Sequence, residues 1–209
     1  MIRLIFIAAV LSLLAACAAD KGRESSPDQI TAAAFRSSAP PSLTLITMGN
    51  NKTGSGVLTA LMINGSQRVI FDPAGSFRDE RVVERGDVLY GISPGWFRAY
   101  QSAHSRASHH VVTQELTVTP AQAEKALRLA QAHGAVPGAF CAQATTGILA
   151  QIEGFEGIKR TFYPVNLMEQ FAAYPGVETQ KYYENDAGHV VDGVAAALEG
   201  AHEAVALGV

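Results

Sequence analysis

Apolar and polar residues alternate along the first part of the chain in the pattern that is typical of β-strands. Residues 43–47 alternate in this way, and residues 57–63 and 68–71 are short apolar runs. The two runs are separated by Asn64-Gly65-Ser66, whose turn-forming residues are typical of a hairpin. A further alternating strand is expected over residues 109–118. The pattern therefore predicts a meander of antiparallel strands.

Apolar residues recur at helical spacing in the second half of the chain. Thr119-Pro120-Ala121-Gln122 combines a capping threonine, a proline in the first turn and a glutamine that can complete a capping box. A helix is therefore expected from residue 120 to about residue 133, before Gly134. Further helices are expected from about residue 140 to 152 and after Pro164. A last amphipathic helix is expected over residues 192–205, with its apolar positions at Val194, Leu198, Ala201 and Val205.

These elements predict a single α+β domain over residues 43–209, in which an antiparallel sheet carries helices packed on one side. Residues 185–209 are expected to form either a terminal helix or a loose tail of this domain. Residues 17–42 are poor in large apolar residues and contain serine and proline pairs, so they are expected to form a flexible tether. A coil of this length reaches about 25 to 30 Å, which would let the domain stand clear of a membrane surface.

Composition and charge narrow the classes of function. The 209 residues are 48% hydrophobic and 17% charged, which is typical of a folded domain and excludes a disordered or collagen-like chain. The formal net charge is −3 and there is no basic block, so we expect no nucleic-acid partner. Gly54-Ser55-Gly56 lacks the lysine of a phosphate-binding loop, and no histidine has a second ligand at helical zinc spacing. We therefore expect neither a cofactor nor a metal site.

The first residues have the three parts of a secretory signal. Arg3 supplies a positive charge, residues 4–14 are apolar, and small residues follow. The apolar run is about half of the roughly 20 residues that are needed to cross a bilayer. Leu14-Ala15-Ala16-Cys17 resembles the bacterial lipobox, which implies that residues 1–16 are removed and that the protein is held on a membrane by lipid on Cys17. The alternative is an ordinary secretory signal with a cysteine at this place by chance.

The same resemblance bears on the compartment and on the second cysteine. In lipoproteins an aspartate after the acylated cysteine tends to cause retention at the inner membrane, and this chain has Ala18 there. The resemblance therefore implies the outer membrane, with the domain facing the periplasm.

Lipid on Cys17 leaves Cys141 without a partner cysteine. A lone thiol in an oxidising compartment is either buried and inert or kept for its reactivity.

Cys141 is the first candidate for chemistry, because it is expected in the first turn of a helix. There the positive end of the helix dipole and the free N–H groups favour the thiolate and lower its pKa. The same N–H groups can form an oxyanion hole. The alternative interpretation is that Cys141 is a small hydrophobic residue that fills a gap between helices.

Three segments resemble a known enzyme superfamily. Gly138-Ala139-Phe140-Cys141-Ala142-Gln143-Ala144-Thr145 resembles the segment that carries the nucleophile in papain-like NlpC/P60 hydrolases. Residues 58–65 and 68–75 resemble the first two strands of the circularly permuted branch of that superfamily. The resemblance covers about residues 43–152 and implies a papain-like fold in permuted order. Because known members cleave amide bonds of cell-wall peptides or handle acyl groups, it also implies envelope components as partners.

One position departs from the family pattern. The catalytic histidine of the permuted branch lies at the start of the first of these strands, where this chain has Leu58 and Thr59. Asp72 matches the residue that orients the missing histidine, although an aspartate before a proline also commonly starts a turn. The replacement bases are His110 and His109, of which His110 shares the inward face of its strand. An inward histidine can equally be a hydrogen-bonded core residue.

These observations leave two hypotheses. Because a cysteine nucleophile needs a base, loss of the histidine favours an outer-membrane lipoprotein whose papain-like domain binds envelope components without catalysis. The alternative is a cysteine hydrolase that acts on amide or acyl bonds of those components, with Cys141 as nucleophile. No role is expected for the histidines in polar or terminal contexts, which are His104, His133, His189 and His202.

Overall fold

The computed structural model describes residues 23–185. The expected signal peptide, the lipobox with Cys17 and the expected helix over residues 192–205 lie outside the described residues. The described part is an α+β domain, as the pattern of the sequence predicts.

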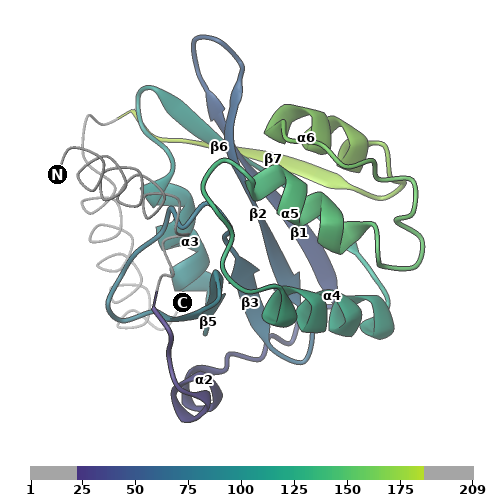
Figure 1. Ribbon diagram of the computed structural model, residues 1–209. Coiled ribbons are helices and arrows are strands. Elements are labelled where there is room, and N and C mark those ends of the chain that lie inside the picture. The colour runs from purple at the N-terminus through teal and green to yellow at the C-terminus, as the bar shows by residue number, and fades with distance from the viewer. Residues whose placement is uncertain (1–22, 186–209) are drawn as a thin grey trace, which may run out of the picture.

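One antiparallel sheet of seven strands forms the centre of the described domain (Figure 1), in the order β4-β5-β3-β2-β1-β6-β7. The predicted meander is confirmed, because β1 pairs with β2, and β2 pairs with β3 across the turn at residues 65–67. The strands are β1 (Ser42–Asn50), β2 (Gly56–Asn64), β3 (Arg68–Phe71), β4 (Val83–Arg85), β5 (Val88–Tyr90), β6 (His109–Thr117) and β7 (Glu178–Tyr183).

The helices begin where the sequence provides capping residues or prolines. Thr119 and Gln122 form the expected capping box at the start of α4. The helices of the described residues are α2 (Pro27–Ala33), α3 (Pro94–Ala103), α4 (Pro120–His133), α5 (Cys141–Leu149) and α6 (Pro164–Ala172). In contrast with α4, α5 has no side-chain cap, so its first N–H groups need other partners.

Helices cover both faces of the sheet, which corrects the expectation that they pack on one side. Leu45 and Leu61 belong to the hydrophobic core beneath α4, α5 and α6. Ile46 and Ala60 are adjacent to Leu45 and Leu61 in the chain, so their side chains point to the opposite face of the sheet. They pack in a second core that contains Tyr100 of α3. The reason is that β1 and β2 carry apolar side chains on both faces of the sheet, so both faces must be buried.

Residues 23–42 do not form the free tether that their composition predicted. The Ser25 N–H donates to the Glu84 carbonyl, and the Arg68 N–H donates to the Phe35 carbonyl. The Asn64 side chain donates to the carbonyls of Ala39 and Pro40. We call residues 23–42 the strap. Backbone hydrogen bonds to the sheet and its turns stabilise the strap, and polar composition gives no sign of such bonds.

Candidate functional site

Cys141 lies at the open edge of β2. Strand β3 ends at Phe71, which pairs with Leu61, so the part of β2 before Leu61 has no strand partner on that side. The first turn of α5 lies there, and the backbone N–H groups of Thr59 and Ala142 face the Cys141 sulfur. The expected position of the thiol, in the first turn of a helix, is therefore observed, and this turn lies beside β2.

The surroundings of this thiol favour the neutral form. Only 5% of Cys141 is exposed, and burial raises the pKa of the thiol above its ordinary value. The N–H groups of Thr59 and Ala142 act in the opposite direction, whereas the negative charge of Asp72 raises the pKa further. The expectation of a lowered pKa is thus wrong, because desolvation outweighs the effect of the helix start.

Leu58 and Thr59 occupy opposite faces of β2. Thr59 is fully buried, and its hydroxyl donates to the Ile46 carbonyl at 3.2 Å. Leu58 alternates with Thr59 and therefore shares the face of Ala60, which belongs to the core beneath α3. The Cys141 sulfur lies against the Thr59 N–H. The Cα atom of Leu58, which carries the side chain, is therefore separated from this contact by a single peptide unit.

The two histidines proposed as bases have other partners. The Nδ1 atom of His110 lies 2.7 Å from Asn51 Oδ1, and its ring stacks on Tyr183 with a centroid distance of 4.7 Å. His109 Nδ1 lies 2.8 Å from the Ser108 hydroxyl. Strand β1 separates β6 from β2, so these histidines lie about 10 Å or more sideways from the strand that contacts the sulfur. The structure does not bring them to Cys141.

A buried polar cluster near Cys141 includes a histidine that the sequence analysis dismissed. His104 is 3% exposed, and its Nδ1–H donates to the Tyr100 carbonyl at 2.7 Å. Its Nε2 lies 2.8 Å from the Ser76 hydroxyl, which lies 3.0 Å from both carboxylate oxygens of Asp72. His104 is thus in a polar context, as expected, but it is buried and hydrogen-bonded. Its position four residues after Tyr100, at the end of α3, is the signal that could have indicated burial.

The same cluster connects Asp72 with the region of the thiol. Asp72 accepts hydrogen bonds from the N–H groups of Ser76 and Phe77, which is the turn role expected of an aspartate before a proline. Its charge raises the pKa values of both Cys141 and Tyr100. The Tyr100 hydroxyl is buried beside Asp72 and Ser76, and both groups influence its pKa. Asp72 is thus connected to His104 through the Ser76 hydroxyl.

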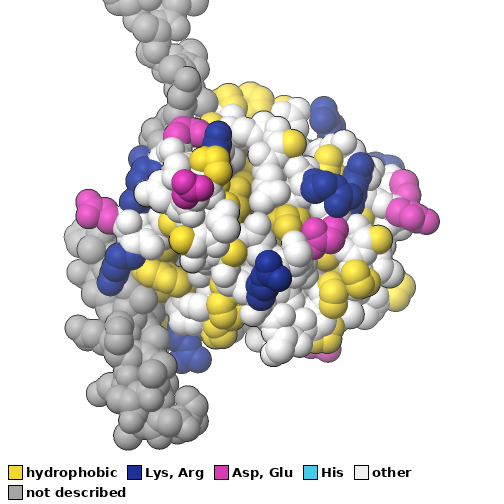
Figure 2. Space-filling view, turned by 90° about the horizontal axis from the view of Figure 1, so that it is seen from below, with side chains coloured by type: hydrophobic (Ala, Val, Ile, Leu, Met, Phe, Trp, Pro, Cys, Tyr) yellow, Lys and Arg dark blue, Asp and Glu magenta, His cyan; other side chains and the backbone are white. Residues whose placement is uncertain are grey.

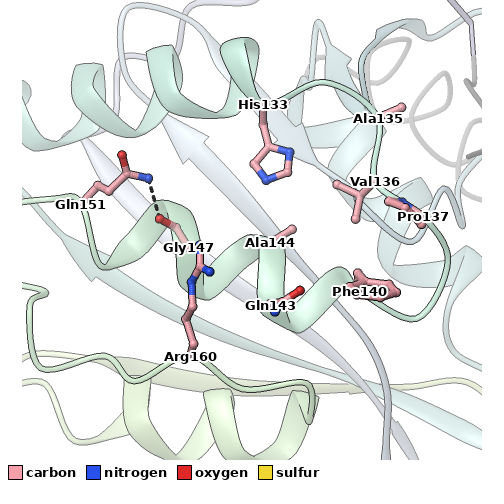
Figure 3. Close-up of a pocket in the computed structure, with 10 residues that line it drawn as sticks. All are labelled: His133, Ala135, Val136, Pro137, Phe140, Gln143, Ala144, Gly147, Gln151 and Arg160. Carbon is pink, nitrogen blue, oxygen red and sulfur yellow. Dashed lines mark hydrogen bonds between the residues drawn. The ribbon is translucent and has the colours of Figure 1, made fainter.

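A hollow of about 230 Å³ opens beside α5 (Figure 3). His133 at the end of α4 and Arg160 contribute to its lining, and Gln143 and Gly147 line it from α5. Phe140, the residue before Cys141, also lines it, whereas Cys141 does not. The hollow therefore offers cationic and hydrogen-bonding groups next to an aromatic ring, separate from the buried thiol.

The described surface has mixed charge. On the face that Figure 2 shows, Lys and Arg side chains are interspersed with Asp, Glu and hydrophobic side chains. Within residues 23–185, no group of three or more His, Cys, Asp and Glu side chains is placed to hold a metal ion. No helix in that part of the chain is long and apolar enough to span a membrane.

Comparisons with known proteins place this chain in no family. No protein-family model matches the sequence, and neither a curated protein nor a solved structure is similar to it. The likeness to permuted NlpC/P60 domains therefore depends on the short segments around Leu58, Asp72 and Cys141.

Proposed function

We propose that this protein is an outer-membrane lipoprotein whose papain-like domain binds envelope components and does not cleave them. The observation that carries the proposal is the environment of Cys141, in which the thiol is buried and its pKa is raised. A neutral thiol is a poor nucleophile, and His109 and His110, the expected bases, have other partners. Lipid on Cys17 would keep the domain at the membrane.

The hollow beside α5 is the binding site that we propose. Arg160 and His133 can bind an anionic oxygen, Gln143 can form hydrogen bonds, and Phe140 offers an apolar surface. These groups suit a small ligand that combines a carboxylate with an apolar substituent, as short peptides do. A volume of about 230 Å³ suits one or two residues of such a peptide.

Titration calorimetry with acetylated dipeptides that end in a free carboxylate tests this site. We expect measurable binding of the free acid, at least tenfold weaker binding of the corresponding amide, and a similar loss in Arg160→Gln. The matched control is Arg128→Gln, which removes an exposed arginine of α4 outside this hollow and should bind like the parent. Equal binding of acid and amide, or an equal loss in both variants, would contradict the proposed site.

The cysteine hydrolase is the second candidate, because the backbone N–H groups of Thr59 and Ala142 at the Cys141 sulfur act to stabilise a thiolate. Amide and ester derivatives of the same dipeptides test it. The non-catalytic proposal predicts no turnover above that of Cys141→Ala. Turnover that disappears in Cys141→Ala would establish the hydrolase instead.

A further inference from the structure

Five large hydrophobic residues are exposed within residues 23–185, and all of them lie toward one end of the sheet. They are Val57, Phe140, Phe162, Tyr163 and Tyr183, with exposed fractions from 41% to 73%. We call these five residues the aromatic band. Monomeric proteins rarely leave such residues grouped on their surface unless the group contacts a partner.

Contacts between neighbouring segments join the members of the band. The rings of Phe140 and Phe162 meet at 5.5 Å, and Tyr163 directly precedes Pro164, which packs against Gly56 beside Val57. Gly56 pairs with Gly49, and the ring of His110 lies over Gly49 and stacks on Tyr183. The band thus extends from the start of α5 past the start of α6 to the end of β7.

The path of the strap shows from which end the chain reaches the sheet. Glu24 pairs with Arg85 at 3.5 Å, and Ser25 bonds to Glu84. Further along the strap, Phe35 bonds to Arg68. In the sheet, Arg85 pairs with Val88, and Val88 pairs with Phe71 at the end of β3. Arg68 lies at the opposite end of β3, as its first residue. The strap therefore starts at the level of Phe71 and runs toward the end of the sheet that holds the β2–β3 turn.

The other end of the sheet, toward which the start of the strap points, is the end that carries the aromatic band. Asn50, Gly56, His109 and Tyr183 all lie at that end, opposite the β2–β3 turn. A membrane anchor before the strap would therefore be attached on the side of the band.

The strap also shortens the connection to that anchor. Arg23 donates a hydrogen bond to the Asp79 carbonyl, so residue 23 is already in contact with the rest of the domain. Cys17 precedes Arg23 by six residues, which span at most about 20 Å when fully extended. The domain is thus attached too closely to stand clear of the headgroups, in contrast with the expectation from composition.

Basic residues flank the band. Lys52 lies in the β1–β2 turn, and Arg160 lines the hollow together with Phe140. Lys181 is close enough to His110 to influence the pKa of that imidazole. Aromatic rings with a basic rim are the side chains that favour the interface between the headgroups and the hydrocarbon of an anionic bilayer.

We propose that the aromatic band inserts into the headgroup region of the membrane to which the protein is anchored, so that the domain lies on the bilayer with this end down. The proposal rests on the lipid anchor of the proposed function. The anchor supplies proximity, while the band and its basic rim set the orientation. Because Phe140 belongs both to the band and to the hollow, the hollow then opens near the headgroups.

Quenching of tryptophan fluorescence by brominated lipids tests this orientation in the full, lipidated chain. Trp96 is the single tryptophan, so Trp96→Phe provides a background for one new probe. In vesicles of phosphatidylethanolamine with one quarter phosphatidylglycerol, we expect Phe162→Trp to lose at least half of its emission when the lipids are brominated near the headgroups. The matched control is Arg128→Trp, an exposed site on α4, which should lose less than a tenth.

The possible results of this experiment test the lipid anchor and the orientation of the domain separately. Failure of the lipidated chain to float with the vesicles would overturn the lipid anchor, and with it this proposal. Flotation with equal quenching of the two probes would overturn the membrane-facing band alone. A concentration-dependent dimer that hides the Phe162→Trp probe from the lipid would assign the band to a second copy of the chain and would also overturn it.

A further variant checks the role of the band itself. Replacing both Phe162 and Tyr163 by serine removes two of its rings at exposed positions, so folding should persist by circular dichroism. With lipid still on Cys17, this variant should float as before but should exchange its backbone amides near residues 52–57 several-fold faster on vesicles than the parent. Unchanged exchange would contradict insertion of the band.

Discussion

The Nε2 atom of His104 lies 2.8 Å from the hydroxyl oxygen of Ser76, inside the core beneath α3. The Nδ1–H of His104 donates to the Tyr100 carbonyl, and the Ser76 hydroxyl donates to the Asp72 carboxylate. Burial lowers the pKa of His104, with Arg106 acting in the same direction and Asp72 in the opposite one. The folded domain therefore favours the neutral form of this imidazole.

The free energy of unfolding should fall as the pH drops below about 6.5, the ordinary pKa of histidine. Between that value and the lower pKa of folded His104, the unfolded chain binds a proton that the folded chain does not, so acid favours unfolding. Urea unfolding between pH 7.5 and 5.5 measures the slope. The slope should be smaller in His104→Gln than in the parent. Equal slopes in the parent and His104→Gln would contradict the assignment.

Leu58→His should make Cys141 more reactive. An imidazole at this position lies one peptide unit from the contact between the sulfur and Thr59, and a neighbouring imidazole favours the thiolate. Alkylation by iodoacetamide at pH 7 should become at least several-fold faster than in the parent. Leu58→Gln, which is polar but does not titrate, should react like the parent. Slower alkylation in His110→Ala than in the parent would instead identify His110 as the base.

Cys17→Ala should release the protein from the membrane or leave it unprocessed. The apolar run before Cys17 is too short to anchor a membrane protein, so attachment requires the lipid. Fractionation of cell envelopes measures the change, and Cys141→Ala should fractionate like the parent. Normal signal cleavage with unchanged membrane association of Cys17→Ala would refute the lipoprotein interpretation.

Gly86→Ala should destabilise the domain by about 1 to 2 kcal/mol. Gly86 and Asp87 form the two-residue β4–β5 turn with positive φ angles of 56° and 62°. A Cβ atom at Gly86 would also lie 3.2 Å from the Gly134 Cα, in the loop that leads to α5. Gly138→Ala is the control, because no atom lies within 4 Å of its added Cβ and its φ is not positive. Equal unfolding free energies of the two variants would contradict this account.

The regular elements with strong local patterns followed from the sequence. The positions of β1, β2, β3 and β6 were predicted from alternation and apolar runs, and α4 from its capping box at Thr119. Strand β7 was missed because its six residues, Glu-Thr-Gln-Lys-Tyr-Tyr, are mostly polar and exposed at the edge of the sheet. Such a strand is specified by pairing with β6, which is not visible in its own composition.

The sequence by itself determined which residues could carry chemistry: one cysteine at the start of a helix, and Leu58 where the resembling family has histidine. Only the tertiary structure decided the state of these groups. Desolvation of Cys141 and the partners of His104 depend on residues far away in the chain, and the strap is held by backbone hydrogen bonds to the sheet. Local sequence encodes periodicity and capping, whereas burial and charge environment arise from contacts that form only when the whole domain has folded.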